Sequence, residues 1–357
     1  MGIESISVDY DAINEKNTFS NGDHISGRVT VHVSSPTKIQ SLAIKAKGKA
    51  KVRWSEHYGN NTTVTYSDKE KYFSEEKLLL EEGPAGSLEL AAGRHVYPFS
   101  FQIPDIDMPP SFKGSHGKIR YNLKAILSRS LHVDKKAKTS FTFIAKAYRP
   151  DPGLMVPQYG SKDKDVGLSF FASGNISMNI STEKMAYHQG EDVQVKAEII
   201  NSSTRKIVPK FYIYQKQSFF AMKRRRVVTK DILKEKGLNP MQSSTSEIMT
   251  QNMTIPKELL PSVLNCRIIK VEYRIKAVLH VSMSRDPEIK LPLIILLQEH
   301  TKEAELPAYD WSTQKMESPP PAYGWSTQTN GDAMSAYNWP NQNEAAPPAY
   351  DWSTNKK

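Results

Sequence analysis

The chain of 357 residues is longer than one typical domain, and its composition, 38% hydrophobic and 24% charged, is that of a globular protein. The single cysteine, Cys266, excludes an intramolecular disulfide framework and any cysteine-cluster zinc or iron–sulfur site. The longest strongly apolar run, residues 291–297, is far shorter than the roughly 20 residues that span a bilayer. These features predict a multidomain protein of the reduced cytoplasm.

The net charge of +10 combines two regions of opposite sign. Residues 302–357 contain four lysines and seven acidic residues, a net charge of −3. Residues 1–301 therefore carry 44 basic and 31 acidic side chains, a net charge of +13. We expect the basic body and the acidic C-terminal segment to bind different partners.

Alternation of apolar and polar residues dominates the body and predicts antiparallel strands. Val29, Val31 and Val33 alternate with polar residues, and residues 193–199 show the same pattern. A turn phrase that runs from an aromatic residue to glycine and an acid precedes each of these strands. The only predicted helix is residues 230–236, ended by Gly237.

One unit occurs twice in the body. Residues 118–127 align with residues 270–279 at an offset of 152, and five of the ten positions are identical. Many short strands separated by turn signals favour sandwiches over barrels. We therefore predict an all-β body of two β-sandwich domains, residues 1–150 and 167–301, joined by a turn-rich linker at residues 151–166.

Two basic segments are candidate contacts for phosphate groups or anionic lipid. The first is a set of cations that alternates with apolar residues or glycine: Lys45, Lys47, Lys49, Lys51 and Arg53. In a strand, all five side chains would point from one face. The second is a continuous run: Lys223, Arg224, Arg225 and Arg226. The alternatives are an ordinary solvated sheet face for the first segment and a solvated loop for the second.

No pattern typical of an enzyme is present. The chain lacks a phosphate-binding loop, a nucleophile elbow and a His-Glu-x-x-His motif, and its nine histidines show no metal-ligand spacing. Cys266 begins an apolar run, which indicates a buried, inert thiol. The basic charge is not accompanied by a nucleic-acid-binding motif. We predict no enzymatic activity, no cofactor, no metal and no nucleic-acid partner.

The C-terminal segment, residues 302–357, is predicted to be a disordered tail. Leu306 is its only Leu, Ile or Val, so it cannot bury enough apolar surface to offset the entropy of ordering. Yet it holds four of the five tryptophans, in four copies of one short phrase. The tyrosines of these copies are Tyr309, Tyr323, Tyr337 and Tyr350. Such a repeat is an array of linear motifs rather than a solenoid.

Two copies match Pro-Pro-x-Tyr, the ligand signature of WW domains. Their residues are Pro320, Pro321 and Tyr323, and Pro347, Pro348 and Tyr350. Consecutive prolines favour the polyproline II conformation, and the tyrosine then lies about one turn along, on the same side. Pro307 and Tyr309 form a copy with one proline of the pair, which predicts weaker binding. The alternative is a proline-rich linker in which the motifs arose by chance.

A two-sandwich body with a Pro-Pro-x-Tyr tail resembles the α-arrestins, the arrestin domain-containing proteins, and within them the vertebrate type-3 group. The resemblance covers essentially the whole chain. It is strongest in residues 19–27, 93–101, 109–112 and 266–273. It implies an arrestin N-domain and an arrestin C-domain, each an immunoglobulin-like β-sandwich.

The resemblance also implies a function. The body would bind membrane cargo such as G-protein-coupled receptors, and the tail would recruit WW-domain HECT-type ubiquitin ligases. The protein would thus promote ubiquitination, endocytosis and sorting to lysosomes, moving from the cytoplasm to the plasma membrane and endosomes. Two alternatives remain open: a retromer-like sorting scaffold, and a protein that binds anionic membrane surfaces without recruiting a ligase.

Overall fold

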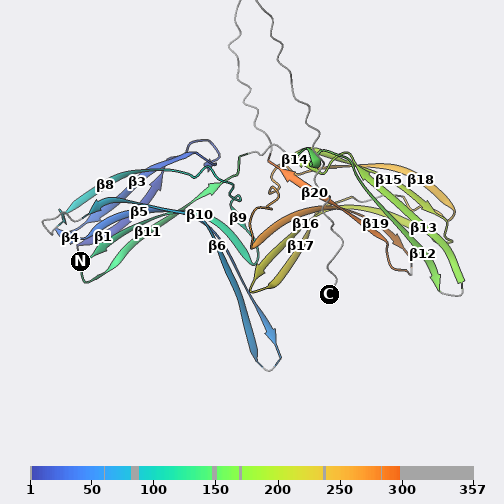
Figure 1. Cartoon of the computed structure of the whole chain (residues 1–357), viewed down its shortest axis with the longest axis horizontal. Helices are drawn as coiled ribbons and strands as arrows, with labels where there is room; N and C mark the ends of the chain where they lie inside the picture. Colours follow the sequence, from blue (N-terminus) through green and yellow to red (C-terminus); the bar gives the residue numbers. More distant parts are fainter. Residues whose placement is uncertain are drawn as a thin grey trace, which may run out of the picture. The chain divides into compact units, whose positions relative to one another are not determined.

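The computed structural model describes residues 2–59, 61–81, 88–146, 151–168, 171–235, 239–282 and 284–297 (Figure 1). The single helical segment of this described part is a short 3-10 helix, η1 (Pro152–Leu154). All its other regular structure is β-strand, as the alternating pattern predicts. The predicted tail, residues 302–357, lies outside the described residues and forms a unit separate from residues 1–301.

The first sandwich is built from two main sheets. Its strands are β1 (Ile3–Tyr10), β2 (Thr18–Phe19), β3 (His24–Val33), β4 (Thr37–Ile39), β5 (Ser41–Tyr58), β6 (Thr62–Glu81), β7 (Leu88–Leu90), β8 (Gly93–Gln102), β9 (Phe112–Lys113), β10 (Gly117–Arg129) and β11 (His132–Phe143). One sheet has the order β1-β3-β8. The other has the order β2-β11-β10-β5-β6, with β9 paired to β10, and β4 pairs with β7 separately.

The second sandwich follows η1. Its strands are β12 (Gln158–Leu168), β13 (Phe171–Thr182), β14 (Ala186–His188), β15 (Asp192–Asn201), β16 (Ile207–Ala221), β17 (Arg224–Lys234), β18 (Thr245–Thr254), β19 (Ile269–Val281) and β20 (Glu288–Leu296). The sheet orders are β12-β13-β15-β18 and β14-β20-β19-β16-β17. The prediction of two tandem β-sandwiches is confirmed.

The repeated phrase occupies equivalent strands of the two sandwiches. β10 lies between β5 and β11, and β19 lies between β16 and β20. Its tyrosines, Tyr121 and Tyr273, are both buried, and each donates a 2.6 Å hydrogen bond to a backbone carbonyl upstream, of Pro109 and Leu260 respectively. Burial raises the pKa of both hydroxyls, that of Tyr273 to about 12. The repeated tyrosine therefore holds the segment that precedes each strand.

The structure corrects two predictions. The helix predicted at residues 230–236 is wrong, because residues up to Lys234 belong to β17, which pairs with β16 from Ala221 to Tyr212. Pairing with β16 outweighs the local helix signal. The predicted linker at residues 151–166 is also too long, since β12 begins at Gln158 and pairs with β13. Its charged sequence is typical of an edge strand, which keeps other chains from pairing with the sheet.

Candidate functional site

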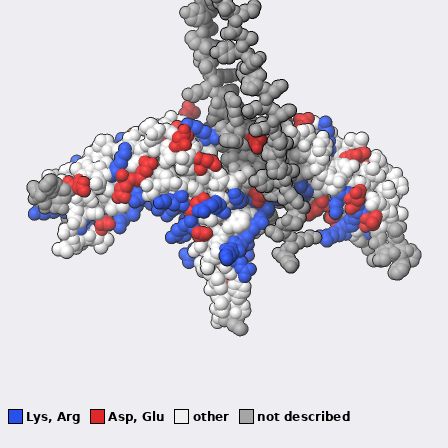
Figure 2. Space-filling model, viewed as in Figure 1, with Lys and Arg blue, Asp and Glu red and all other residues white. Residues whose placement is uncertain are grey.

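The first predicted basic segment lies on β5 and behaves as the alternation predicts. Lys45, Lys47, Lys49, Lys51 and Arg53 are partly or fully exposed, while the residues between them are buried. All five cations therefore point from the same face of the sheet. Figure 2 shows Lys and Arg side chains gathered beside the hairpin of β5 and β6 that projects from the sheet in Figure 1.

Strand register adds more cations to this face than the sequence pattern indicated. Lys49 lies opposite Arg120 on β10 and Lys71 on β6, and Lys51 lies opposite Lys118 and Lys69. We call the outward cations of this sheet the N-face. They are Lys45, Lys47, Lys49, Lys51, Arg53, Lys69, Lys71, Lys113, Lys118, Arg120, Lys124 and Lys138.

The N-face has a buried aromatic support. Gly48, between Lys47 and Lys49, lies opposite Tyr121, and a Cβ atom at Gly48 would come within 2.6 Å of the Tyr121 ring. That ring packs 4.6 Å, centroid to centroid, from the ring of Phe143. Glycine at position 48 is therefore required for close packing rather than for a turn.

The cations of the N-face are poorly compensated. Among the described residues, the only ion pair that an N-face cation makes is Lys45 with Glu76, at 2.7 Å. Burial, followed by the charges of Lys47 and other lysines nearby, lowers the pKa of Lys49. The charge of Arg120, followed by burial, lowers the pKa of Lys118. Mutual repulsion of this kind favours the binding of an anion.

A cavity of about 380 Å³ opens at one end of the N-face. Five N-face cations line it: Lys51, Arg53, Lys113, Lys118 and Arg120. The rest of its wall is the turn from Gly114 to Gly117, which is closed by a 2.8 Å hydrogen bond from the Gly114 amide to the Gly117 carbonyl. The size and lining of the cavity suit a multiply charged anionic group.

The second predicted basic segment begins in the tight turn between β16 and β17, where Met222 and Lys223 have φ values of 49° and 61°. Arg224, Arg225 and Arg226 are exposed, and they form the start of β17 rather than a loop. Arg225 donates to the Ser218 hydroxyl at 2.8 Å and lies over the Phe220 ring.

The two basic segments come together in the structure. The ring of His116, which lines the N-face cavity, contacts Phe219 of β16 edge-on at a centroid distance of 5.6 Å. Burial, followed by the charge of Arg226, lowers the pKa of His116. The second sandwich thus adds Arg226 to the positive potential at the N-face cavity, which the sequence alone did not indicate.

Models of two protein domains match these two halves. Residues 6–148 match the arrestin (or S-antigen) N-terminal domain, and residues 172–300 match the arrestin (or S-antigen) C-terminal domain. The chain belongs to the arrestin family. Its curated relatives include α-arrestins, which supports membership of that branch.

Those relatives cover most of the body of this arrestin. Human arrestin domain-containing protein 4 is 30% identical over 286 residues, which span 78% of this chain and 68% of the relative. The mouse protein of the same name is 29% identical over 286 residues. Rat thioredoxin-interacting protein is 29% identical over 281 residues, 78% of this chain and 70% of that protein. The likeness to the type-3 group stays a prediction.

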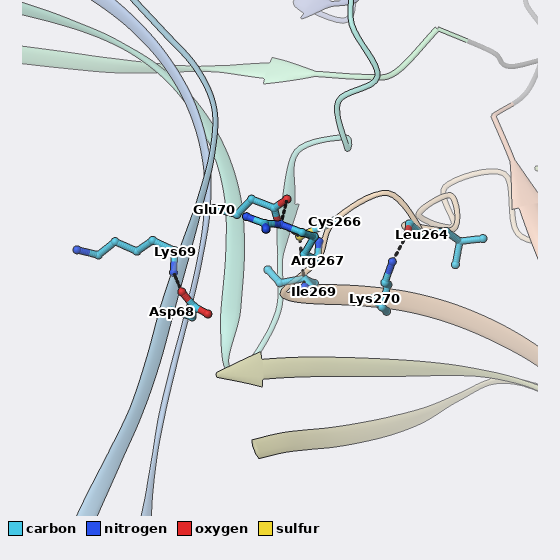
Figure 3. A network of polar contacts seen from close by, with 8 residues as sticks. All are labelled: Asp68, Lys69, Glu70, Leu264, Cys266, Arg267, Ile269 and Lys270. Atoms are coloured by element: carbon cyan, nitrogen blue, oxygen red, sulfur yellow. Dashed lines mark hydrogen bonds and ion pairs between the residues drawn. The ribbon is translucent and has the colours of Figure 1, made fainter. Parts of the chain in front are cut away.

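A carboxylate that sequence reasoning missed joins the two arrestin domains (Figure 3). Glu70 of β6 accepts a 2.8 Å hydrogen bond from the Arg267 amide and a 3.2 Å bond from the Arg267 guanidinium. The Cys266 thiol donates to the same carboxylate at 3.4 Å. Glu70 lies between Lys69 and Lys71 in the sequence, and no sequence pattern indicates its role. The side chains of β6 alternate between the two faces of the sheet, so Glu70 points away from the N-face.

Cys266 is buried, as predicted. Burial raises the pKa of its thiol, so the reactive thiolate is disfavoured at neutral pH. Among the described residues, no group of three or more His, Cys, Asp or Glu side chains is placed to hold a metal ion. None of the helical structure described in this arrestin is long and apolar enough to cross a membrane.

The predicted WW-binding residues lie outside the described residues. These are Pro307, Tyr309, Pro320, Pro321, Tyr323, Pro347, Pro348 and Tyr350. Their assignment continues to rest on the sequence motif. The described site is therefore the basic surface of the arrestin body, formed by the N-face and residues 224–226.

Proposed function

We propose that this α-arrestin is a trafficking adaptor that brings WW-domain HECT-type ubiquitin ligases to membrane cargo. In this proposal the body binds the cytosolic part of the cargo, and the tail binds the ligase. The observation that carries the proposal is the joining of an arrestin body to two Pro-Pro-x-Tyr motifs in one chain. Membership of a family of adaptor-like proteins supports it.

The N-face defines the chemistry of the cargo segment. Its cations make one ion pair among the described residues, so an acidic or phosphorylated cytosolic segment would supply the missing counter-charges. G-protein-coupled receptors are the cargo class that the α-arrestin resemblance suggests. The sequence of the N-face favours anionic segments in general and does not select one receptor.

The tail motifs define the ligase partner. Tyr323 and Tyr350 are 27 residues apart, a spacing that a flexible chain would span with an r.m.s. distance of about 30 Å. That distance allows two WW domains of one ligase to be occupied together, which raises the overall affinity through effective concentration. The adaptor supplies proximity in this scheme, and the ligase supplies the catalytic group.

The cellular consequence follows from that proximity. A ligase held next to cargo would ubiquitinate it and so promote its endocytosis and its sorting through endosomes to lysosomes. The adaptor would accordingly move between the cytoplasm, the plasma membrane and endosomes.

A pulldown with an array of tandem WW domains tests the ligase half of the proposal. We expect the full chain to be captured and the double variant Tyr323→Ala/Tyr350→Ala to be lost. Tyr337→Ala is the matched control, because the copy around Tyr337 has the tyrosine without the preceding prolines. Full-strength capture of the double variant would contradict the assignment.

The copy at Tyr309 provides a graded comparison in the same assay. Tyr309→Ala should weaken capture less than Tyr323→Ala, because Leu306 replaces the first proline of its motif. An equal loss from both single variants would show that the second proline and the tyrosine suffice for binding.

A further inference from the structure

The hairpin of β10 and β11 exposes two apolar side chains at its end, Leu131 in the turn and Val133 at the start of β11. Leu131 is fully exposed and Val133 is 85% exposed. Arg129 and His132 are the last residues to pair across the hairpin, so Leu131 lies in the turn itself. We call Leu131 and Val133 the hairpin tip. This turn is at the opposite end of β10 from β9 and the N-face cavity.

The conformation of Leu131 makes its identity unexpected. Its φ is 58°, in the left-handed region that glycine and asparagine adopt most readily. Full exposure means that the leucine side chain adds nothing to the packed core. Neither backbone conformation nor solubility favours leucine over asparagine here, so the side chain needs an explanation from outside the fold.

Basic side chains lie close to the hairpin tip. From residue 129 to residue 136 the hairpin has three Lys or Arg and one acidic residue, Asp134. The basic residues are Arg129, Lys135 and Lys136. Lys136 pairs with Asp134 at 3.2 Å, and Arg129 donates to the Val133 carbonyl at 3.2 Å. Lys135 makes no ion pair with a described residue.

We propose that the hairpin tip is a membrane anchor. Leu131 and Val133 enter the boundary between the headgroups and acyl chains of a bilayer, and the surrounding cations contact the phosphates of anionic lipids. Burial of apolar side chains and attraction to anionic headgroups are the two contributions that hold peripheral proteins at such surfaces. The site is separate from the N-face segments already considered for cargo.

The shape and charge of the hairpin favour a lipid surface over a protein groove. The tip is the convex end of a two-stranded hairpin, which penetrates a deformable surface with little area of contact. Three cations and one carboxylate give this end of the hairpin a net positive charge, which complements an anionic leaflet. A membrane contact at this end would also hold the arrestin body near the cytosolic segments of membrane cargo.

Flotation of the full chain with vesicles tests the anchor. The vesicles are phosphatidylcholine alone, or phosphatidylcholine and phosphatidylserine in equal amounts. We expect flotation with the anionic vesicles, and an approximately tenfold or greater loss for Leu131→Asn/Val133→Thr. Higher salt should reduce the binding of the unaltered chain, because it screens the surrounding lysines.

The two substitutions are chosen to keep the fold. Asparagine accepts a positive φ better than leucine, and threonine retains the branched shape that strands favour. The double variant should therefore have an unchanged or higher melting temperature. Ile248→Thr is the matched control, since Ile248 is 79% exposed on β18 but lies opposite Glu198 rather than among lysines.

The outcomes separate this proposal from the others. Loss of flotation in the double variant, with melting temperature kept and the Ile248→Thr control normal, supports the anchor. Unchanged flotation of the double variant overturns it, as does a loss that is explained by altered self-association in sedimentation velocity. Tyr323→Ala/Tyr350→Ala should float normally, so failure of the ligase proposal would not be mistaken for failure of the anchor.

Discussion

The same strand phrase supports two sheet faces that differ sharply in charge compensation. Arg120 of β10 and Glu272 of β19 occupy equivalent positions in the repeat. Arg120 lies opposite Lys49, whereas Glu272 lies opposite Lys216 and forms a 3.1 Å ion pair with it. At this position of the repeat, the residue of the first sandwich adds to the repulsion between cations. The residue of the second sandwich neutralises a neighbouring lysine.

The second face also places cations over aromatic rings. Lys276 lies 4.3 Å from the centroid of the Tyr212 ring and 5.7 Å from that of Tyr214. Ion pairs and cation–π contacts satisfy charge on this face, whereas the N-face makes one ion pair among the described residues. The fold therefore does not require an uncompensated basic sheet, and the N-face is a specific feature of the first sandwich.

The aromatic supports of the two faces differ in a related way. Gly48 lies opposite Tyr121, and Gln215 lies opposite Tyr273 in the second sandwich. Gln215 donates a 2.7 Å hydrogen bond to the Tyr273 hydroxyl. In the first sandwich a glycine leaves space for the tyrosine ring, whereas in the second a glutamine donates a hydrogen bond to the tyrosine hydroxyl.

Gly48→Ala should reduce the stability of the protein more than any other substitution considered below. The added Cβ would lie within 2.8 Å of the rings of both Tyr121 and Phe73. We expect overpacking to reduce the free energy of unfolding of the first sandwich by about 2–3 kcal/mol. Thermal unfolding followed by near-ultraviolet circular dichroism measures the change, and Gly59→Ala is the control, since a Cβ there has no neighbour within 4 Å. Equal melting temperatures for the two variants would contradict the packing argument.

Tyr273→Phe should cost more than Tyr121→Phe. Loss of the Tyr273 hydroxyl leaves both the Leu260 carbonyl and the Gln215 amide without that partner, whereas loss of the Tyr121 hydroxyl affects the Pro109 carbonyl alone. We expect losses of about 2 and about 1 kcal/mol respectively in the free energy of unfolding. Urea denaturation measures both values, and the reverse order would contradict the argument that the number of hydrogen-bond partners determines the loss.

Exchange of charge at the equivalent positions tests the electrostatic comparison. Arg120→Glu should weaken the binding of a fluorescent polyglutamate peptide by about tenfold, because it removes a cation and provides Lys49 with a partner. Glu272→Arg should strengthen the binding, since it leaves Lys216 without its ion pair. Fluorescence anisotropy at low salt measures both affinities. Unaltered affinity in both variants would remove the N-face as the anion-binding surface.

The sequence predicted those features that depend on local periodicity. The alternation at residues 45–53 and the 152-residue offset led to the exposed cations and to two sandwiches, because strand period and repetition are local properties. The contributions of Arg120 and Lys71 to the N-face were not predicted, since they depend on which strands pair and in what register.

The other features that the sequence did not predict have similar causes. The helix predicted at residues 230–236 failed because pairing with β16 determines the conformation of β17. Glu70 was missed because its partner, Arg267, is distant in the sequence and belongs to the other sandwich. The exposed turn at Leu131 was missed because a positive φ at leucine has no sequence signature.

An adaptor must bind its ligase and its cargo at the same time, and this property can be measured with one probe for each partner. An immobilised array of tandem WW domains is incubated with the full chain and then with the fluorescent polyglutamate peptide. We predict that the peptide is retained by the unaltered chain, lost with Tyr323→Ala/Tyr350→Ala and about tenfold more weakly held with Arg120→Glu. Peptide retention that is the same for all three proteins would contradict the proposed adaptor function.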